Sequence, residues 1–283
     1  MLRTTEGTPV VIGHRIGRGG EGTVYTVANA ERLALKIYHE HGADREHHIQ
    51  SLIEATRSGA SAAVAWPKRR VLDPSKATVG FLMEAFCDAR PIHELYTPFS
   101  RRTWFPAANS AFLRRTALNL ARVVARVHDD GFVIGDLNHS SVLVLPNATV
   151  RLVDADSFPL APNFICRVGT PEYMPFDLQG ADLNTVPRSP RHDVFALSVL
   201  IYQLLFGGRH PFAGYGGRPK AALADNITKV RRYQLSDQQK MVLHNRLGMT
   251  RTPALTDLFQ ASFSQGRGSV SNAQSWADAL AGV

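Results

Sequence analysis

Apolar and β-branched residues near the N-terminus fall into short runs that predict three successive β-strands. These runs cover residues 10–16, 22–28 and 33–38. Apolar residues at helical spacing predict helices over residues 44–56, which Asp44 can cap, and over residues 111–129. Residues 193–206 are apolar nearly all round, which indicates a buried helix. We expect the basic and aromatic segment 98–106 to be a loop.

Two further apolar runs in the middle of the chain each accompany an aspartate. Residues 142–145 and 150–153 look like two short strands joined at Pro146-Asn147. Asp136 precedes the first strand and Asp154 follows the second. Such a hairpin would bring both carboxylates to one edge, where one could orient a substrate and the other could bind magnesium. The alternative is that both are ordinary polar residues in turns.

A glycine-rich segment, Gly17-Arg-Gly-Gly-Glu-Gly22, joins the first two predicted strands. Glycines let a backbone approach phosphate groups closely and direct its N–H groups toward them. The motif is weak alone, because glycine-rich hairpin turns are common. A strand follows it, whereas a dinucleotide-binding fold requires a helix there.

The order of these parts resembles that of Hanks-type protein kinases. The glycine segment is followed by Lys36 in the third strand, by Asp136 and Asp154, and then by Gly169-Thr-Pro-Glu-Tyr173. The resemblance implies an α+β, two-lobed protein kinase fold that occupies residues 1–283 as a single domain. Residues 1–86 would form a small antiparallel sheet with one helix and end in a hinge. Residues 87–283 would form a larger helical lobe.

The resemblance also implies an ATP site. Lys36 would hold the α- and β-phosphates, Met83 would stand beside the adenine, and the backbone groups of Glu84 and Phe86 would bind the base. The full set of expected ATP contacts is Gly17, Gly19, Gly22, Val24, Ala34, Lys36, Met83, Glu84, Phe86 and Leu143. Read without the family, Lys36 is an exposed strand lysine and Met83 an ordinary core residue.

The expected catalytic residues are Asp136, Asn138, Lys36 and Glu46. Asp136 would orient or deprotonate the substrate hydroxyl, and Asn138 stands where related kinases carry a lysine that contacts the γ-phosphate. In kinases a helix glutamate pairs with the strand lysine, and Glu46 and Glu54 are the candidates here. We favour Glu46, because it places Ile49 and Ile53 on the inward face.

The metal ligands implied by the resemblance are Asp154 and Ser141, with Mg²⁺ or Mn²⁺ as the ion. Ser141 replaces the asparagine that is usual in the family. Asp156 either helps to hold a second metal or faces solvent, and we expect it to face solvent. Gly135 stands where regulated kinases carry an arginine that receives an activation-loop phosphate, so control by such a phosphate is not expected.

Several features resemble one bacterial subgroup, the helix-hairpin-helix kinases associated with tellurite-resistance operons. They are Gly-Asp-Leu-Asn138, Asp-Ala-Asp-Ser-Phe158 and the segment 188–206. That resemblance suggests a partner phosphatase or a von Willebrand-type domain protein. Asp177 stands where the family has a glutamate, and we take Arg267 as its expected partner.

Composition narrows the remaining possibilities. With 44% hydrophobic and 20% charged residues, the chain is globular, and its formal net charge of +8 favours anionic partners. The arginines are scattered, so we expect no nucleic-acid partner. Cys87 and Cys166 match no metal or disulfide spacing and are expected to be free thiols. The apolar run 194–206 is too short to span a bilayer, and no signal peptide is evident, so we expect no membrane association and a cytoplasmic location.

The expected function is ATP-dependent phosphorylation of serine or threonine hydroxyls in a protein substrate. Two alternatives remain open. Asn138 and Ser141 favour a pseudokinase that binds nucleotide and acts as a scaffold, whereas Lys36, Asp136 and Asp154 favour the enzyme. A kinase for small molecules is disfavoured, because Gly169-Thr-Pro-Glu-Tyr173 has the form found in protein kinases.

Overall fold

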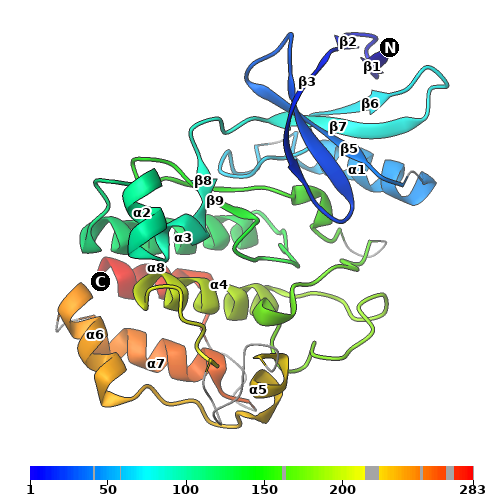
Figure 1. Ribbon diagram of the computed structural model, residues 1–283. Coiled ribbons are helices and arrows are strands. Elements are labelled where there is room, and N and C mark those ends of the chain that lie inside the picture. Colours follow the sequence, from blue (N-terminus) through cyan, green and yellow to red (C-terminus); the bar gives the residue numbers. More distant parts are fainter. Residues whose placement is uncertain are drawn as a thin grey trace. The chain divides into compact units, whose positions relative to one another are not determined.

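A computed structural model describes residues 1–40, 42–57, 59–160, 164–213, 223–248, 251–265 and 271–282 (Figure 1). The chain forms two compact units. The first contains Met1–Asp88 together with Leu152–Asp156, and the second contains Ala89–Arg151 and Ser157–Val283. The predicted boundary after residue 86 is therefore close, but the segment that carries Asp154 belongs to the first unit.

The first unit is built on an antiparallel sheet of seven strands in the order β2-β1-β6-β7-β5-β4-β3. The sheet is strongly curled (Figure 1). Its strands are β1 Leu2–Thr4, β2 Pro9–Val10, β3 Ile12–Arg18, β4 Gly22–Val27, β5 Leu33–Tyr38, β6 Arg69–Leu72 and β7 Thr78–Glu84. The three predicted strands correspond to β2 with β3, to β4 and to β5. The short strands β1 and β6 were not predicted.

One helix, α1 Ala43–Ala55, accompanies this sheet and contacts β6. It begins one residue earlier than predicted, with Gly42 rather than Asp44 at the capping position. Its buried residues are His48, Ile49 and Leu52. Beneath the sheet, buried apolar side chains form a core of Val10, Val27, Leu35, Val71, Val79 and Leu82. Burial of these side chains fixes the register of β5 and β7, which in turn places the functional residues described below.

The second unit is helical, with a small sheet in the order β10-β9-β8. The strands are β8 Arg90–Pro91, β9 Val142–Val144 and β10 Val150–Leu152. The described helices are α2 Pro98–Trp104, α3 Ser110–Asp129, α4 Pro190–Leu205, α5 Leu223–Lys229, α6 Asp237–Leu247, α7 Thr252–Phe263 and α8 Ala273–Ala281. Short 3-10 turns lie at Ile92–Leu95 and Pro171–Tyr173, and a third, Ala155–Ser157, lies where the chain leaves the first unit's segment and returns to the second.

The predicted helices in this unit correspond to α3 and α4, and α4 is buried along almost its whole length. The expected loop at residues 98–106 is wrong, because α2 forms there. Thr97 caps that helix by accepting a hydrogen bond from the Ser100 N–H, and Pro98 suits its first turn. In the part of the chain that the structure describes, no helix is long and apolar enough to cross a membrane.

Candidate active site

The glycine segment forms the turn between β3 and β4. The Gly19 N–H donates to the Gly22 carbonyl at 2.9 Å, and Gly17 pairs with Val24 across the ladder. A side chain at Gly22 would begin 2.6 Å from the Ile37 carbonyl oxygen, so only glycine fits there. Gly17 and Gly19 face open space, which is the arrangement a phosphate-binding turn requires.

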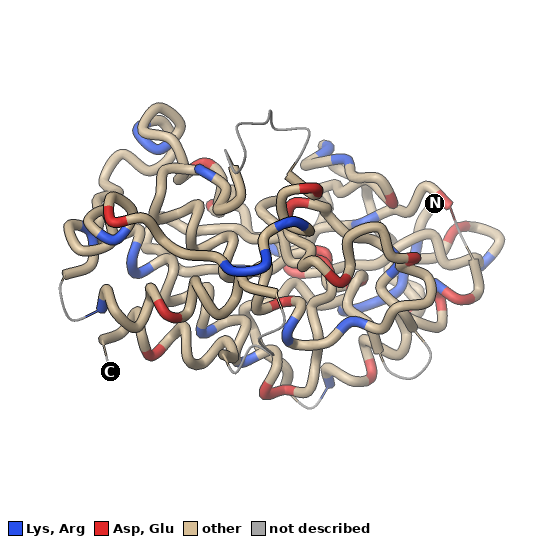
Figure 2. The backbone as a smooth tube through the Cα atoms, turned by 90° about the horizontal axis from the view of Figure 1, so that it is seen from below, with Lys and Arg blue, Asp and Glu red and all other residues tan. Residues whose placement is uncertain are grey.

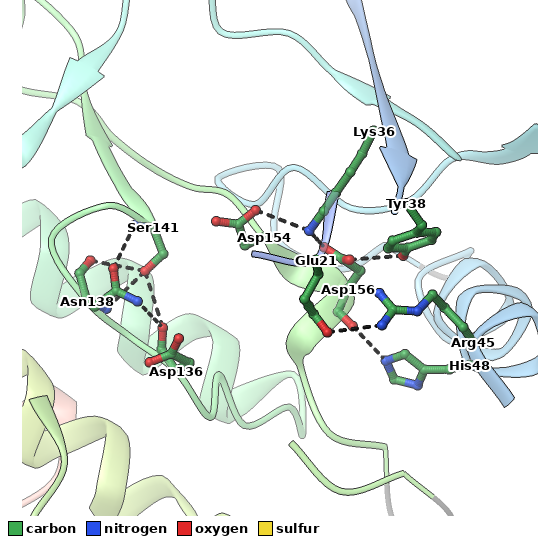
Figure 3. Close-up of polar contacts among 10 residues, drawn as sticks. All are labelled: Glu21, Lys36, Tyr38, Arg45, His48, Asp136, Asn138, Ser141, Asp154 and Asp156. Carbon is green, nitrogen blue, oxygen red and sulfur yellow. Dashed lines mark hydrogen bonds and ion pairs between the residues drawn. The ribbon is translucent and has the colours of Figure 1, made fainter. Parts of the chain in front are cut away.

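Lys36 lies in β5 and is buried, with 6% of its surface exposed. Its Nζ donates to Asp156 Oδ1 at 2.8 Å and lies 3.4 Å from Asp154 Oδ1 (Figure 3). Burial by itself lowers the pKa of the lysine, but the carboxylates of Asp156 and Asp154 outweigh it, and the net pKa is raised. The strand therefore holds a charged ammonium group beside two acids.

A chain of contacts extends from Asp156 to the glycine turn within the same unit. Tyr38, two residues after Lys36 on β5, donates its hydroxyl to Asp156 Oδ2 at 2.9 Å. Burial, reinforced by Asp156, raises the pKa of Tyr38 well above its ordinary value, so the phenol stays protonated and donates. Arg45 of α1 lies over the Tyr38 ring at 4.2 Å and pairs with Glu21 of the glycine turn at 3.1 Å (Figure 3).

His48 ties helix α1 to the same segment. Its Nε2 lies 3.1 Å from the carbonyl oxygen of Asp156. Since a carbonyl only accepts, Nε2 carries the proton in this contact. Burial lowers the pKa of His48 to about 4, so the ring is neutral at pH 7.

The predicted pairing of Lys36 with Glu46 is replaced by a different arrangement. Glu46 forms its ion pair with Arg70 of β6, and its side chain is 45% exposed. The inward face of α1 is the face of His48, two residues further along the helix. Asp156 occupies the position of lysine partner in place of a helix glutamate.

Asp156 also departs from the expectation that it faces solvent. Its side chain is only 1% exposed, and both carboxylate oxygens accept hydrogen bonds. Asp154, by contrast, has a half-exposed side chain and a left-handed backbone with φ of 61°. A non-glycine residue in this conformation is uncommon, and such strain concentrates at functional sites.

The expected adenine contacts of this unit are placed by the sheet register. Ala34 of β5 pairs with Met83 of β7, and both are buried. Val24 pairs with Lys36 across β4 and β5. The segment expected to form the hinge follows β7. There the Ala85 N–H donates to the Arg32 carbonyl oxygen at 3.0 Å, and the Glu84 side chain pairs with Lys68 at 3.1 Å.

The second unit holds the remaining site residues in the loop before β9. The Asp136 Oδ1 accepts a hydrogen bond from the Thr170 N–H at 2.9 Å, which links it to the predicted substrate-side loop. Asn138 and Ser141 lie in the same loop as Asp136, and Leu143 lies in β9. Asp154 belongs to the first unit, so the convergence of Asp136 with Asp154 stays a prediction.

The side chains of Asn138 and Ser141 are directed into their own loop. Asn138 Nδ2 donates to the Asp136 carbonyl at 3.1 Å, while its Oδ1 accepts from the Ser140 N–H at 2.8 Å. The Ser141 hydroxyl lies 3.0 Å from both the N–H and the carbonyl oxygen of Asn138. Both residues therefore shape the loop that presents Asp136.

Most of this chain matches the sequences of known proteins. The protein kinase domain family matches residues 10–265. The chain belongs to the protein kinase family. Two relatives in Escherichia coli are named protein kinase YegI, one from strain K12 and one from O157:H7. They are 34% identical to this chain over 250 and 252 residues, covering 84% of this chain but only 38% of each relative.

Sequence reasoning missed the residue that anchors the loop carrying Asp136. Asp193, in the first turn of α4, is 1% exposed. Its carboxylate accepts hydrogen bonds from the N–H groups of Ile134 and Gly135, at 2.8 and 2.9 Å, and lies 2.9 Å from His128 Nε2. A charged residue at the start of an otherwise apolar helix was the available signal.

Gly135 is required by this anchoring. Its φ is 82°, and a side chain there would begin 3.0 Å from both Cβ and Sγ of Cys166. Burial raises the pKa of the Cys166 thiol to about 11, which makes it an unreactive packing group. The space beside Asp136 is thus occupied by a buried thiol in this kinase domain.

Asp177 lies in the loop after the predicted substrate-side segment and has an ion-pair partner among the described residues. Asp177 pairs with Arg191 of α4, whereas Arg267 lies outside the described residues. His192, whose Nε2 lies 3.4 Å from Asp177 Oδ2, lowers the pKa of Asp177 most, and Arg191 adds to this against the opposing effect of burial. The first turn of α4 therefore holds both the catalytic loop, through Asp193, and the loop containing Asp177.

The kinase family generally uses ATP with Mg²⁺, and the donor atoms here fit a metal held partly by nucleotide phosphates. Asp154 offers a half-exposed carboxylate, a hard oxygen ligand. Asp156 has both oxygens engaged, so it is not available in this arrangement. Among the described residues, no cluster of three or more His, Cys, Asp or Glu side chains could hold a metal ion alone.

Proposed function

We propose that this kinase domain transfers the γ-phosphate of ATP to serine or threonine hydroxyls of a protein substrate. The observation that carries the proposal is the buried Lys36 ammonium, kept charged by Asp154 and Asp156 one strand away from the glycine turn. A permanently charged lysine in this place is suited to bind phosphate groups. Few other functions explain why a lysine would be buried there.

The remaining roles are proposed from the chemistry of the residues and from their order along the chain. The turn of Gly17, Gly19 and Gly22 offers backbone N–H groups to the phosphates, while Val24, Ala34, Met83, Phe86 and Leu143 provide apolar contacts for the base. Asp136 orients the substrate hydroxyl and accepts its proton. Asp154, with Ser141 as the second proposed ligand, would hold Mg²⁺ or Mn²⁺, which supplies charge neutralisation at the phosphates.

A pseudokinase remains the second candidate because of one specific observation. The side-chain oxygens of Asn138 and Ser141 are both engaged by the backbone of their own loop. Neither is directed outward as a charged or strongly coordinating group. A domain of this kind could bind nucleotide and still transfer phosphate slowly.

One experiment separates the two candidates. The domain is incubated with γ-labelled ATP and a general protein acceptor in Mg²⁺ or Mn²⁺, and nucleotide affinity is measured separately by calorimetry. We expect transfer by the native chain, loss of transfer in Asp136→Asn with ATP binding retained, and loss of both in Lys36→Met. ATP binding without transfer in the native chain would identify a pseudokinase. Analysis of the labelled amino acids distinguishes serine and threonine from tyrosine.

Location and partners are further proposals. We infer a cytoplasmic site of action, because ATP and a reducing environment suit a chain with free Cys87 and Cys166. The chain spans about two-fifths of its curated relatives, so the activity of a full-length protein is proposed from this domain alone. Membership of the helix-hairpin-helix subgroup, and a phosphatase or von Willebrand-type partner, stay predictions from sequence resemblance.

A further inference from the structure

A cavity of about 450 Å³ lies in the second unit, away from the residues assigned above. It is formed where α2, the start of α3 and the end of α6 meet. Three arginines line it: Arg101 and Arg102 in the last turn of α2, and Arg246 in the last turn of α6. No aspartate or glutamate lines it. Its volume is in the range of cavities that bind small molecules or single side chains.

The three guanidinium groups have no acidic partner among the described residues. None of them forms an ion pair there, whereas Arg45, Arg70, Arg126 and Arg191 elsewhere in the chain all do. Burial lowers the pKa of Arg246, and the nearby charge of Arg101 lowers it further. Like charges held together in a partly buried place are unfavourable unless an anion joins them.

The remaining walls of the cavity suit a peptide. Phe105, Pro106 and Leu113 provide an apolar side, and Asn109 and Ser110 lie at the positively polarised start of the long helix α3. On the same short helix as two of the arginines, Phe99 is 84% exposed. An exposed large aromatic beside a charged cavity is typical of a surface that contacts another protein.

We propose that this arginine cavity binds the phosphate group of a phosphoserine or phosphothreonine in a protein segment. Planar guanidinium groups bind phosphate through paired hydrogen bonds, and clusters of arginines are the usual means of recognising phosphorylated peptides. This site does not rest on the proposed catalytic function, because it shares no residue with it. A kinase domain with such a cavity could hold a phosphorylated protein while acting elsewhere on it.

Nucleic acid is a poorer fit to the same charges. Lys and Arg are interspersed with Asp and Glu along the part of the chain that the structure describes (Figure 2). Binding to a nucleic-acid backbone requires a succession of basic contacts along its length. Three arginines gathered around one cavity instead match one compact anion.

The test measures binding of a fluorescein-labelled peptide that contains one phosphoserine beside a phenylalanine, by anisotropy in 0.15 M salt with the whole chain. We expect Arg101→Gln and Arg246→Gln each to weaken binding about tenfold, because each removes one charged phosphate contact. Arg246→Lys keeps the positive charge but replaces the planar guanidinium, with its paired N–H donors, by an ammonium group. We expect affinity for the phosphopeptide to fall several-fold. Arg122→Gln, an exposed arginine of α3 outside the cavity, is the matched control and should leave affinity within about twofold.

Thermal unfolding of each variant shows that the fold is retained, since removing one of several mutually repelling arginines should not lower Tm. The proposal is overturned if the unphosphorylated peptide binds equally well, if Arg122→Gln loses as much affinity as Arg246→Gln, or if Arg246→Lys binds like the native chain. Competition by inorganic phosphate as strong as competition by unlabelled phosphopeptide would assign the cavity to small phosphate compounds, and would overturn the peptide assignment. Displacement of the peptide by mixed-sequence RNA at equal concentration would also overturn the peptide assignment and would assign the cavity to nucleic acid.

Discussion

Lys36 donates its shortest hydrogen bond to Asp156, only 2.8 Å away, and not to a glutamate of helix α1. The two side chains are among the few buried charges of the first unit, and Tyr38 and His48 complete the surroundings of Asp156. A buried ion pair is stable only when its remaining hydrogen-bonding groups are satisfied, and here the second carboxylate oxygen is satisfied by Tyr38. The lysine is thus held in place by a residue that follows Asp154 by two positions.

Removal of Asp156 should therefore destabilise the domain strongly. Asp156→Ala leaves the Lys36 ammonium buried with only the longer contact to Asp154. We expect the free energy of unfolding to fall by about 3 kcal/mol, the usual cost of leaving one member of a buried pair unpartnered. Urea unfolding followed by circular dichroism measures the change, and ATP affinity should fall with it because the lysine loses its position.

Glu46→Ala is the matched control for that variant. Its partner Arg70 is only 20% exposed but also donates to the Thr78 hydroxyl at 3.2 Å, and Glu46 itself is nearly half exposed. Exposed pairs contribute at most about 1 kcal/mol, so stability and ATP affinity should change little. A greater loss in Glu46→Ala than in Asp156→Ala would restore the helix glutamate as the functional partner of Lys36.

The lowered pKa of buried His48 should make the stability of the domain depend on pH. Its folded-state pKa of about 4 lies below the ordinary value of 6.5, because burial disfavours the charged ring. As pH falls, His48 is protonated in the unfolded chain before it is protonated in the folded chain. Its contribution to the free energy of unfolding is therefore fully present above pH 6.5 and is lost as pH falls toward 4. Over this interval we expect a loss on the order of 2 kcal/mol in the free energy of unfolding.

The comparison of two neighbouring histidines isolates that effect. His48→Gln keeps an N–H that can reach the Asp156 carbonyl but cannot titrate, so the acid-side slope should become shallower between pH 6.5 and 5. His47→Gln, an exposed position on the same helix, should keep the native slope. Identical slopes in all three proteins would show that His48 is not protonated on unfolding in the way described.

Asp193 of α4 should be essential for holding the loop that carries Asp136. Asp193→Ala leaves the N–H groups of Ile134 and Gly135 without their acceptor in a buried place. We expect a loss of about 3 kcal/mol or more in unfolding free energy, together with loss of transfer activity as Asp136 is displaced. Asp225→Ala, which removes an exposed aspartate paired with Lys229, should cost less than about 1 kcal/mol. Equal effects would contradict the anchoring role.

The strands and long helices of this domain were predictable because local pattern determines them. The runs that became β4 and β5 are short and rich in apolar and β-branched residues, and the periodic residues of α3 bury one face of that helix. Strands β1 and β6 have three and four residues, too few to show a period. Helix α2 was missed because Thr97 and Pro98 act as a start signal that its aromatic and basic composition obscured.

The candidate site also contains residues that local order predicts and contacts that only the folded chain shows. Lys36, Asp136 and Asp154 were assigned from order and spacing, and their roles stay predictions. The partner that Lys36 has in the structure was not predicted, because it depends on how the chain bends after β10. The 3-10 turn at Ala155–Ser157 reverses the direction of Asp156 into the interior. Spacing along α1 alone favoured Glu46, and only the contact of His48 with the Asp156 backbone shows which face of that helix is inward. Long-range contacts of this kind are absent from a local pattern.

The last prediction concerns the metal. Asp154 offers a half-exposed carboxylate, while the Ser141 hydroxyl is shared with the backbone of Asn138. One ligand is therefore strong and the other weak, and Mn²⁺ tolerates irregular oxygen sites better than Mg²⁺, which demands near-ideal octahedral geometry. We expect transfer to be faster with Mn²⁺, and Ser141→Asn to raise the rate with Mg²⁺ and narrow the gap between the two ions. Steady-state rates in each metal measure this.

Asp154→Asn tests the metal site by a second measurement, Mn²⁺ binding, which does not require turnover. It should abolish transfer with either ion and weaken Mn²⁺ binding in the presence of ADP, as followed by electron paramagnetic resonance, because it removes the charged ligand. Asp156→Asn keeps the size of its side chain and should alter stability more than Mn²⁺ affinity, since both Asp156 oxygens are engaged by Lys36 and Tyr38. A larger loss of Mn²⁺ affinity in Asp156→Asn than in Asp154→Asn would make Asp156 the metal ligand. An unchanged metal preference in Ser141→Asn would show that the second ligand does not limit the rate.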